Sequence, residues 1–457
     1  MKVRWTLLLA LIFVATLPIE SLPALTQSRM TVPAHSSFAG IWEGKMDNFP
    51  AIDLTINEVE GKVSGWVLLY FQVGSAIPLL TPQAEGKALK FEVEDHRCGG
   101  CGEQPLKHQF RMELTGPDEA TLRQLDVPKT DKSTGPGLKL VRRQKSTPWS
   151  DPSSHQVQFI IVEYGVRLEV LDWGGTGRPV VLLAGSGNTA HVFDDFALQL
   201  NGFCHVYGIT RRGYGESSHP DTGYTQQRLA EDVLEVLNSL QLTKSALVGH
   251  SMAGEELTAL GAEHSDRLAG LVYLDAASDP TDFPASSPAY MALYQNLPPE
   301  MRQHAAPSAS DRKSFSAYRN WQMQSGGVPF PESELRNQYE SNSDGSVGQF
   351  RTSPRIHAAI GAGALKRDYS RIRVPILALF PSSGDKPRYE PKNAQERAAI
   401  EAFDAATQAY ILRWKKNLQK APGNVRIIDL PGANHYIFNS NAADVRRELR
   451  DFLSGLH

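Results

Sequence analysis

Residues 247–260 read LVGHSMAGEELTAL, and they place one serine, Ser251, between small residues. The apolar run that ends at Val248 is typical of a buried strand, whereas Leu257 and Leu260 have the spacing of a helix face. A sharp corner between a strand and a helix needs small neighbours, because larger side chains would collide there. The stretch therefore predicts a turn that presents the Ser251 hydroxyl at the edge of a sheet.

The surrounding chain alternates between apolar runs and helical patterns from residue 157 to residue 457. The strand-like runs are 179–185, 204–210, 245–250, 269–275, 374–380 and 425–430. Such alternation predicts an α/β fold, with a mostly parallel sheet covered by helices on both faces. Residues 277–370 interrupt the alternation, and we expect them to form an inserted, partly helical lid. Its Met and aromatic residues could line an apolar pocket or form the lid's own core.

Residues 36–145 have a different rhythm. Ile52, Leu54 and Ile56 alternate with polar residues, a period of two that is typical of antiparallel strands with one buried face. We therefore expect a small antiparallel all-β domain there, and a Ser- and Pro-rich linker over 146–156.

The first residues have the composition of an export signal. Lys2 and Arg4 precede an apolar run that is shorter than a membrane span, so residues 1–25 are expected to be a signal peptide of a secreted or periplasmic protein. No later stretch is apolar enough to cross a bilayer. The formal net charge of −3 argues against a nucleic-acid partner.

The chain has three cysteines, Cys98, Cys101 and Cys204. Cys98 and Cys101 could form a small disulfide or remain free thiols. A metal site with His96 and His108 is disfavoured, because a second cysteine pair is missing. Cys204 lies in an apolar run and is expected to be a small buried residue.

The segment 249–254, GHSMAG, resembles the nucleophile elbow of the α/β-hydrolase superfamily, with Ser251 as the nucleophile. It departs from the family pattern at Ala253, where a glycine is usual, and Gly254 follows one place later. The resemblance implies an acid and then a histidine further along the chain. His435, in the loop PGANHY after the last strand-like run, matches the histidine. Asp385 is the expected acid, and Asp275, after the preceding strand, is the alternative.

The resemblance also implies donors for the oxyanion of a tetrahedral intermediate. These would be the backbone N–H groups of Met252 and of Ser186, the latter in the loop AGSGN after a strand-like run. The segment 210–217, TRRGYGES, resembles the family's tight turn after the next strand, and a structural role is expected for it.

Together these features predict a serine hydrolase that cleaves a carboxylic ester, a small-molecule acyl substrate, through an acyl-enzyme, with no metal or organic cofactor. A peptidase or amidase like proline iminopeptidases, with Glu255 or Glu256 anchoring the substrate amine, remains an alternative, as do a lactonase and a C–C bond hydrolase. A non-catalytic binding protein on a hydrolase scaffold is the alternative from another class.

Overall fold

The computed structural model describes residues 38–456, except for residues 47–48, 60, 70–73, 76, 96–105, 127–136, 144–148, 283, 285–286, 303–305, 326–327, 329 and 383–388. The predicted signal peptide, Cys98, Cys101 and Asp385 lie outside the described residues. The chain divides into two compact units. One unit contains the described residues up to 143 together with 159–167, and the other contains 149–158 and 168–456.

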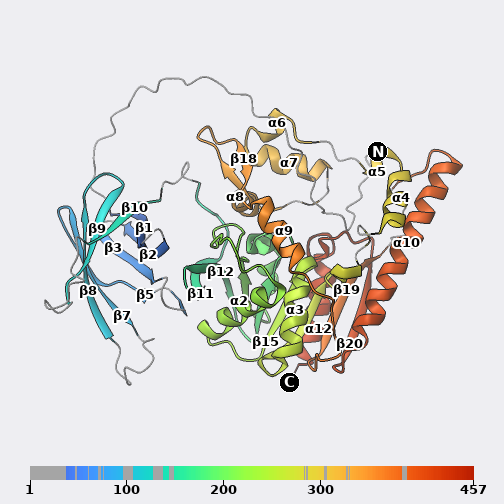
Figure 1. Cartoon of the computed structure of the whole chain (residues 1–457), viewed down its shortest axis with the longest axis horizontal. Helices are drawn as coiled ribbons and strands as arrows, with labels where there is room; N and C mark the ends of the chain where they lie inside the picture. The colour runs from blue at the N-terminus through green and yellow to red at the C-terminus, as the bar shows by residue number, and fades with distance from the viewer. Residues whose placement is uncertain are drawn as a thin grey trace. The chain divides into compact units, whose positions relative to one another are not determined.

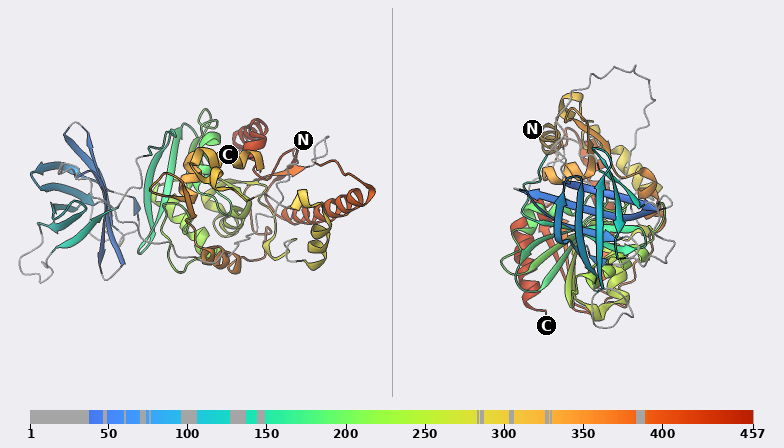
Figure 2. Two further views of the ribbon diagram at one scale, coloured as in Figure 1. Left: turned by 90° about the horizontal axis from the view of Figure 1, so that it is seen from above. Right: turned by 90° about the vertical axis from the view of Figure 1, so that its left-hand side faces the viewer.

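The N-terminal unit is built on a purely antiparallel sheet with the strand order β5-β3-β2-β1-β10-β9-β8-β7-β6. Figure 2 shows its blue strands crossing over its cyan strands, so that the sheet folds across itself. The expected alternation is present: Ile52, Leu54 and Ile56 are buried, and they pack with Trp42 and Phe91 in one apolar cluster. The strands are β1 (Gly40–Met46), β2 (Phe49–Val59), β3 (Lys62–Leu69), β5 (Ile77–Pro78), β6 (Leu80–Glu85), β7 (Ala88–Asp95), β8 (Leu106–Leu114), β9 (Glu119–Gln124) and β10 (Leu138–Arg142).

Residues 159–167 belong to the N-terminal unit, although the sequence placed them at the start of the second domain. Ile160 and Ile161, in β11 (Gln156–Glu163), pair with the short strand β4 (Gly74–Ser75). The Arg167 guanidinium forms a buried ion pair with Asp53. These contacts join the segment to residues far earlier in the chain, which a boundary drawn from local composition could not anticipate.

The second unit contains a mixed, mostly parallel sheet. Its strands run in the order β20-β19-β16-β15-β13-β14-β12, and only β12 is antiparallel to its neighbour in this series. Helices α2, α3 and α12 lie against the sheet in Figure 1. The strands are β12 (Val166–Gly175), β13 (Pro179–Leu183), β14 (His205–Ile209), β15 (Ser245–His250), β16 (Leu268–Leu274), β19 (Ile376–Ser382) and β20 (Val425–Pro431). The helices between and after them are α1 (Asp194–Ala197), α2 (Gln226–Ser239), α3 (Gly254–Glu263), α10 (Ala394–Leu418), α11 (Ile437–Ser440) and α12 (Ala442–Ser454).

The strand order reverses at β13, because β14 pairs on one of its sides and β15 on the other. In open α/β sheets the loops at the carboxyl ends of the strands diverge at such a point and leave room for a ligand. The loop after β13 begins at Ala184, and the corner after β15 holds Ser251. The topology therefore brings the two sequence motifs together at the carboxyl edge of the sheet.

The insertion between β16 and β19 is mostly helical, as expected. It contains α4 (Pro288–Asn296), α5 (Pro299–Arg302), α6 (Ala309–Arg312), α7 (Phe315–Ser325), α8 (Glu332–Gln338), the hairpin β17 (Tyr339–Ser341) and β18 (Val347–Phe350), and α9 (Pro354–Ala362). Figure 1 shows α4 and α5 beside α10, and α7, α8 and β18 at the other side of the insertion. Tyr290 packs against Phe403 of α10, and Phe315 and Tyr318 belong to the main core, so these aromatic residues serve packing. Among the described residues, no helix is both long and apolar enough to span a membrane.

Candidate active site

Ser251 stands at the corner between β15 and the helical turn η2 (Ser251–Ala253), which leads into α3. Its φ of +54° is in the left-handed region, which costs a residue with a Cβ atom about 1–2 kcal/mol. The fold holds this strained conformation with close packing. A Cβ atom on Gly249 would lie 2.9 Å from the Leu257 side chain, so a larger residue two places before the serine would force Leu257 to shift.

Close packing explains why a glycine, Gly254, stands one place later than in the usual motif. A Cβ atom on Gly254 would lie 1.8 Å from the carbonyl oxygen of Ala276, in the loop after β16. The buried Arg367 guanidinium donates a hydrogen bond to the same carbonyl. Ala253 is fully buried and leaves the corner intact. Gly254 therefore lets the start of α3 approach the loop that carries Asp275.

His435 lies between the serine and an aspartate. Its Nε2 is 3.0 Å from Ser251 Oγ, and its Nδ1 is 2.6 Å from Asp275 Oδ2. In the tautomer that this arrangement requires, Nδ1–H donates to the carboxylate and Nε2 accepts from the hydroxyl. Both His435 and Asp275 are buried, with exposed fractions of 9% and 6%. The three side chains therefore form a hydrogen-bonded chain with the geometry of a Ser-His-Asp triad.

The carboxylate that contacts His435 is that of Asp275, the alternative acid predicted from the sequence, whereas the preferred Asp385 lies outside the described residues. Both ring nitrogens of His435 have partners among the described residues, Asp275 at Nδ1 and Ser251 at Nε2. Asp275 follows β16 with a φ of +47°, and its backbone N–H donates to the Leu379 carbonyl at 2.8 Å. That bond to the neighbouring strand fixes the turn that points the carboxylate at His435.

His250, the residue before the nucleophile, supports the histidine loop. Its Nε2 is 3.0 Å from the backbone carbonyl of His435 and therefore carries the hydrogen of that bond. Burial, together with the neighbouring His435, holds the pKa of His250 well below its ordinary value, so its ring is neutral. The sequence alone indicates no role for His250, although this residue belongs to the GHSMAG motif.

The expected oxyanion loop lies against the nucleophile. A Cβ atom on Gly185 would be 3.0 Å from the Cβ of Ser251 and 2.8 Å from Nδ1 of His250. The loop can approach this closely only because Gly185 has no side chain. Ser186 follows immediately, and Met252 follows Ser251, so both expected donor residues are adjacent to this contact.

A buried carboxylate from the insertion holds the rest of this loop. Glu334 of α8 accepts hydrogen bonds from the Asn188 side chain at 2.8 Å and from the backbone N–H of Thr189 at 3.1 Å. Gln338, one turn later, donates to the Gly187 carbonyl at 2.7 Å. Burial outweighs these donors and raises the pKa of Glu334 to about 7. Sequence reasoning missed Glu334 because it lies far along the chain from the loop that it holds.

The same loop is tied to the histidine loop through Asn188. The Tyr436 hydroxyl donates to Asn188 Oδ1 at 3.0 Å, and Tyr436 directly follows His435. One asparagine side chain thus connects α8, the oxyanion loop and the histidine loop.

Arg211 ties the oxyanion loop to the helix of the nucleophile. Its Nε lies 2.5 Å from Glu256 Oε1, and its Nη2 donates to the Ala184 carbonyl at 3.0 Å. Arg212, the next residue, forms a buried bidentate pair with Asp232, with both bonds at 2.6 Å. The TRRGYGES segment is therefore structural, as expected, and Arg211 also supports the site.

The acids that follow the nucleophile are buried. Glu256 is paired with Arg211, and burial raises the pKa of Glu255 to about 7 although Arg367 opposes this shift. Cys204 is a buried free thiol whose pKa burial raises to about 12, in agreement with its expected packing role.

Comparison with known proteins places this geometry in a family. The model of the alpha/beta hydrolase family matches residues 180–448. A segment of 150 residues is 27% identical to an sn-1-specific diacylglycerol lipase from Xenopus laevis and covers 32% of this chain and 46% of that protein. A segment of 101 residues is 26% identical to a 2-(acetamidomethylene)succinate hydrolase from Mesorhizobium japonicum and covers 22% of this chain and 36% of that protein. The chain thus spans less than half the length of each of these curated relatives.

Solved structures with low sequence identity also align. An esterase from Rhodococcus sp. ECU1013 aligns with a TM-score of 0.44 and 20% identity, over 66% of this chain and 100% of that one. An E-2-(acetamidomethylene)succinate hydrolase aligns with a TM-score of 0.47 and 17% identity, over 66% of this chain and 100% of that one. The family model covers more than half of the chain, and it includes β13 from Val180 onward, the Ser251 corner and His435. The chain belongs to the alpha/beta hydrolase family.

Proposed function

We propose that the protein is a serine hydrolase that cleaves carboxylic esters through an acyl-enzyme formed on Ser251. The observation that carries the proposal is the unbroken hydrogen-bonded chain from Ser251 Oγ through His435 to Asp275. In the proposed reaction His435 Nε2 takes the hydroxyl proton while Ser251 Oγ attacks the ester carbonyl. Asp275 holds the ring in the correct tautomer and stabilises the imidazolium that forms.

Collapse of the tetrahedral intermediate completes acylation. His435 gives its proton to the leaving alcohol, and the same histidine then activates the water that hydrolyses the acyl-enzyme. The backbone N–H groups of Met252 and Ser186 are the proposed donors to the oxyanion. Rigid placement of such donors stabilises the developing charge without reorganisation. The contacts of Gly187 and Asn188 with α8 supply that rigidity.

The surroundings favour an ester over a substrate with a free amine. An aminopeptidase requires an available acid near the nucleophile to bind the substrate amine. Glu256 is paired with Arg211, Glu255 is buried beside Arg367, and Glu334 accepts bonds from Asn188 and Thr189. These three acids therefore have structural surroundings that do not leave them free to anchor an amine.

A fluorophosphonate probe and a substrate panel test the proposal. We expect the probe to label the native protein and the Ser265→Ala variant, whose missing hydroxyl lies beyond the far end of α3, but not Ser251→Ala. In the panel, p-nitrophenyl acetate, butyrate and octanoate should be hydrolysed faster than amino-acyl p-nitroanilides and γ-lactones. Failure of the probe to label a folded protein would refute serine catalysis. Preferential cleavage of the anilides or the lactones would retain the nucleophile but refute the ester assignment.

A further inference from the structure

A second group of reactive side chains lies in the same unit, apart from the residues of the Ser251 site. It consists of Asp151 and His155, just before β11, and His191 and Asp194, in the helical turn η1 (Ala190–Phe193) and at the start of α1. One ligand atom from each of the four residues lies within 4.8 Å of every other. We propose that these four residues form a binding site for a divalent transition-metal ion of the zinc type.

The distances between the side-chain atoms fit such an ion. Asp151 Oδ2 lies 3.6 Å from His155 Nε2 and 3.6 Å from His191 Nδ1. Asp194 Oδ2 lies 3.4 Å from His191 Nδ1. Four ligands at about 2.0–2.1 Å from a tetrahedral zinc ion are separated from one another by about 3.4 Å. The three distances are therefore close to the spacing of ligands on one ion, and the four ligand atoms all lie within 4.8 Å of one another.

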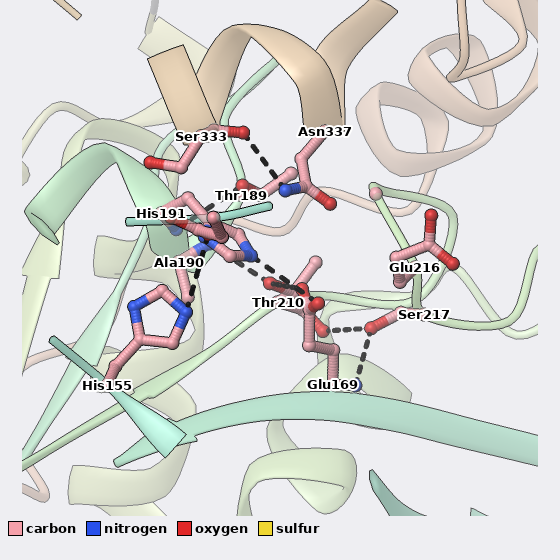
Figure 3. Close-up of polar contacts among 12 residues, drawn as sticks. His155, Glu169, Thr189, Ala190, His191, Thr210, Glu216, Ser217, Ser333 and Asn337 are labelled. Atoms are coloured by element: carbon pink, nitrogen blue, oxygen red, sulfur yellow. Dashed lines mark hydrogen bonds and ion pairs between the residues drawn. The ribbon is translucent and has the colours of Figure 1, made fainter. Parts of the chain in front are cut away.

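The nitrogen atoms that do not face Asp151 are held by carboxylates. His155 Nδ1 lies 2.8 Å from Asp194 Oδ1, and His191 Nε2 lies 3.4 Å from Glu169 Oε1. Figure 3 shows His191 beside His155 and reaching toward Glu169. Glu169 is not one of the four proposed ligands, and a carboxylate of this kind on one imidazole nitrogen fixes the ring and directs the other nitrogen to a metal, an arrangement that recurs at zinc sites.

One nitrogen of the cluster is buried without a hydrogen bond. Among the described residues His191 Nδ1 has no hydrogen-bond partner, although the side chain is 97% buried and this nitrogen faces the carboxylates of Asp151 and Asp194. A buried polar atom without a partner is costly, and a metal ion would satisfy it. Two imidazole nitrogens with two carboxylate oxygens are ligands that suit zinc. Asp151 is 25% exposed, which gives an ion a path from solvent.

A bound ion would cross-link two segments that are distant in the sequence. It would join the segment before β11 to the segment that follows the oxyanion loop. Asp194 also accepts hydrogen bonds from Trp173 Nε1 at 3.0 Å and from Ser333, the neighbour of Glu334 on α8. The expected effect of the ion is therefore on stability, without a step in the reaction at Ser251.

Metal binding can be measured directly on the full chain. For this experiment Cys98 and Cys101 are both replaced by serine, so that this pair of thiols cannot bind zinc. Metal is removed from the protein with a chelator, and the chelator is then removed. After equilibration with Zn²⁺ and gel filtration, mass spectrometry should find one zinc per chain. Co²⁺ in place of Zn²⁺ should give the visible absorption of a tetrahedral site. Zn²⁺ at a hundredfold excess over Kd should stabilise the native state by about 2.7 kcal/mol and raise Tm by about 4 °C.

Variants locate the ion. His155→Gln, His191→Gln and Asp151→Asn should each lose the stoichiometric zinc and the rise in Tm. His205→Gln should retain both, because His205 Nε2 pairs with Asp172 at 2.8 Å outside the cluster. Asp151→Asn is the decisive variant if a histidine variant fails to fold, since Asp151 is partly exposed. Absence of zinc binding by the parent chain, or retention of one zinc by folded Asp151→Asn, would overturn the proposal.

Discussion

Asp275→Asn is the sharpest test of how His435 is held. The carboxylate accepts the Nδ1–H of His435 at 2.6 Å, and both side chains are buried. An amide of the same shape can instead present its NH₂ group to Nδ1, which moves the hydrogen of the ring to Nε2. Nε2 then faces Ser251 Oγ at 3.0 Å as a donor and cannot accept the proton of the hydroxyl.

The expected loss is a thousandfold or more in kcat, or about 4 kcal/mol of transition-state stabilisation at that lower bound. The fold should survive, because Asp275 has a φ of +47°, and asparagine adopts the left-handed region more readily than most residues. Tm should therefore change little. Steady-state hydrolysis of p-nitrophenyl butyrate, with Tm measured on the same samples, separates the two effects.

Asp385→Asn is the matched control and should hydrolyse the ester at a rate close to that of the parent protein. If Asp385→Asn is crippled while Asp275→Asn is nearly normal, Asp275 is not the acid, and the contact with Nδ1 is only structural.

Three further changes probe the support of the site. Gly254→Ala should lower the free energy of unfolding by about 1–3 kcal/mol, because the new methyl group collides with the Ala276 carbonyl. The same change should lower the activity. Urea denaturation measures the first loss, and ester hydrolysis measures the second. Arg211→Met should cost about 3–5 kcal/mol of stability by leaving buried Glu256 unpaired, and a variant as stable as the parent in urea would argue against this ion pair as a support. Burial raises the pKa of Glu255 from 4.5 to about 7. Between these two pH values the native state therefore binds more protons than the unfolded state. The free energy of unfolding consequently falls as pH rises through this window. Glu255→Gln should make the dependence less steep in denaturation curves from pH 4.5 to 7.5, and an unchanged slope would contradict the raised pKa.

The sequence was sufficient to predict the α/β fold, the antiparallel N-terminal sheet and the meeting of Ser251 with His435. These features depend on local periodicity and on motifs at the ends of strands. The identity of the acid that contacts His435 does not follow from local periodicity or from a motif. β16 and β19 are parallel neighbours, so the loops after both strands begin at the same edge of the sheet. Only the direction of a side chain distinguishes Asp275 from a residue after β19, and the order of residues along the chain does not encode that direction.

The remaining contacts of the site were beyond sequence reasoning because they join distant segments. Glu334 belongs to the insertion, and its partner Asn188 belongs to a loop that looked like a simple glycine-rich turn. The proposed metal ligands are two pairs, Asp151 with His155 and His191 with Asp194, which stand on different segments. Each pair alone is a common surface combination, and only the folded chain brings the pairs together.

The bonds of α8 restrict how a substrate can enter. Glu334 and Gln338 hold Asn188 and the Gly187 carbonyl from one face of this helix. Lifting α8 to admit a substrate would release the loop that carries Ser186, so opening by this route would displace one of the two proposed oxyanion donors. A conformational change that admits a substrate must therefore leave α8 in place and move other parts of the insertion. For the same reason, a small molecule that wedges between α8 and Asn188 would act as an allosteric inhibitor, silencing the enzyme without contact with Ser251.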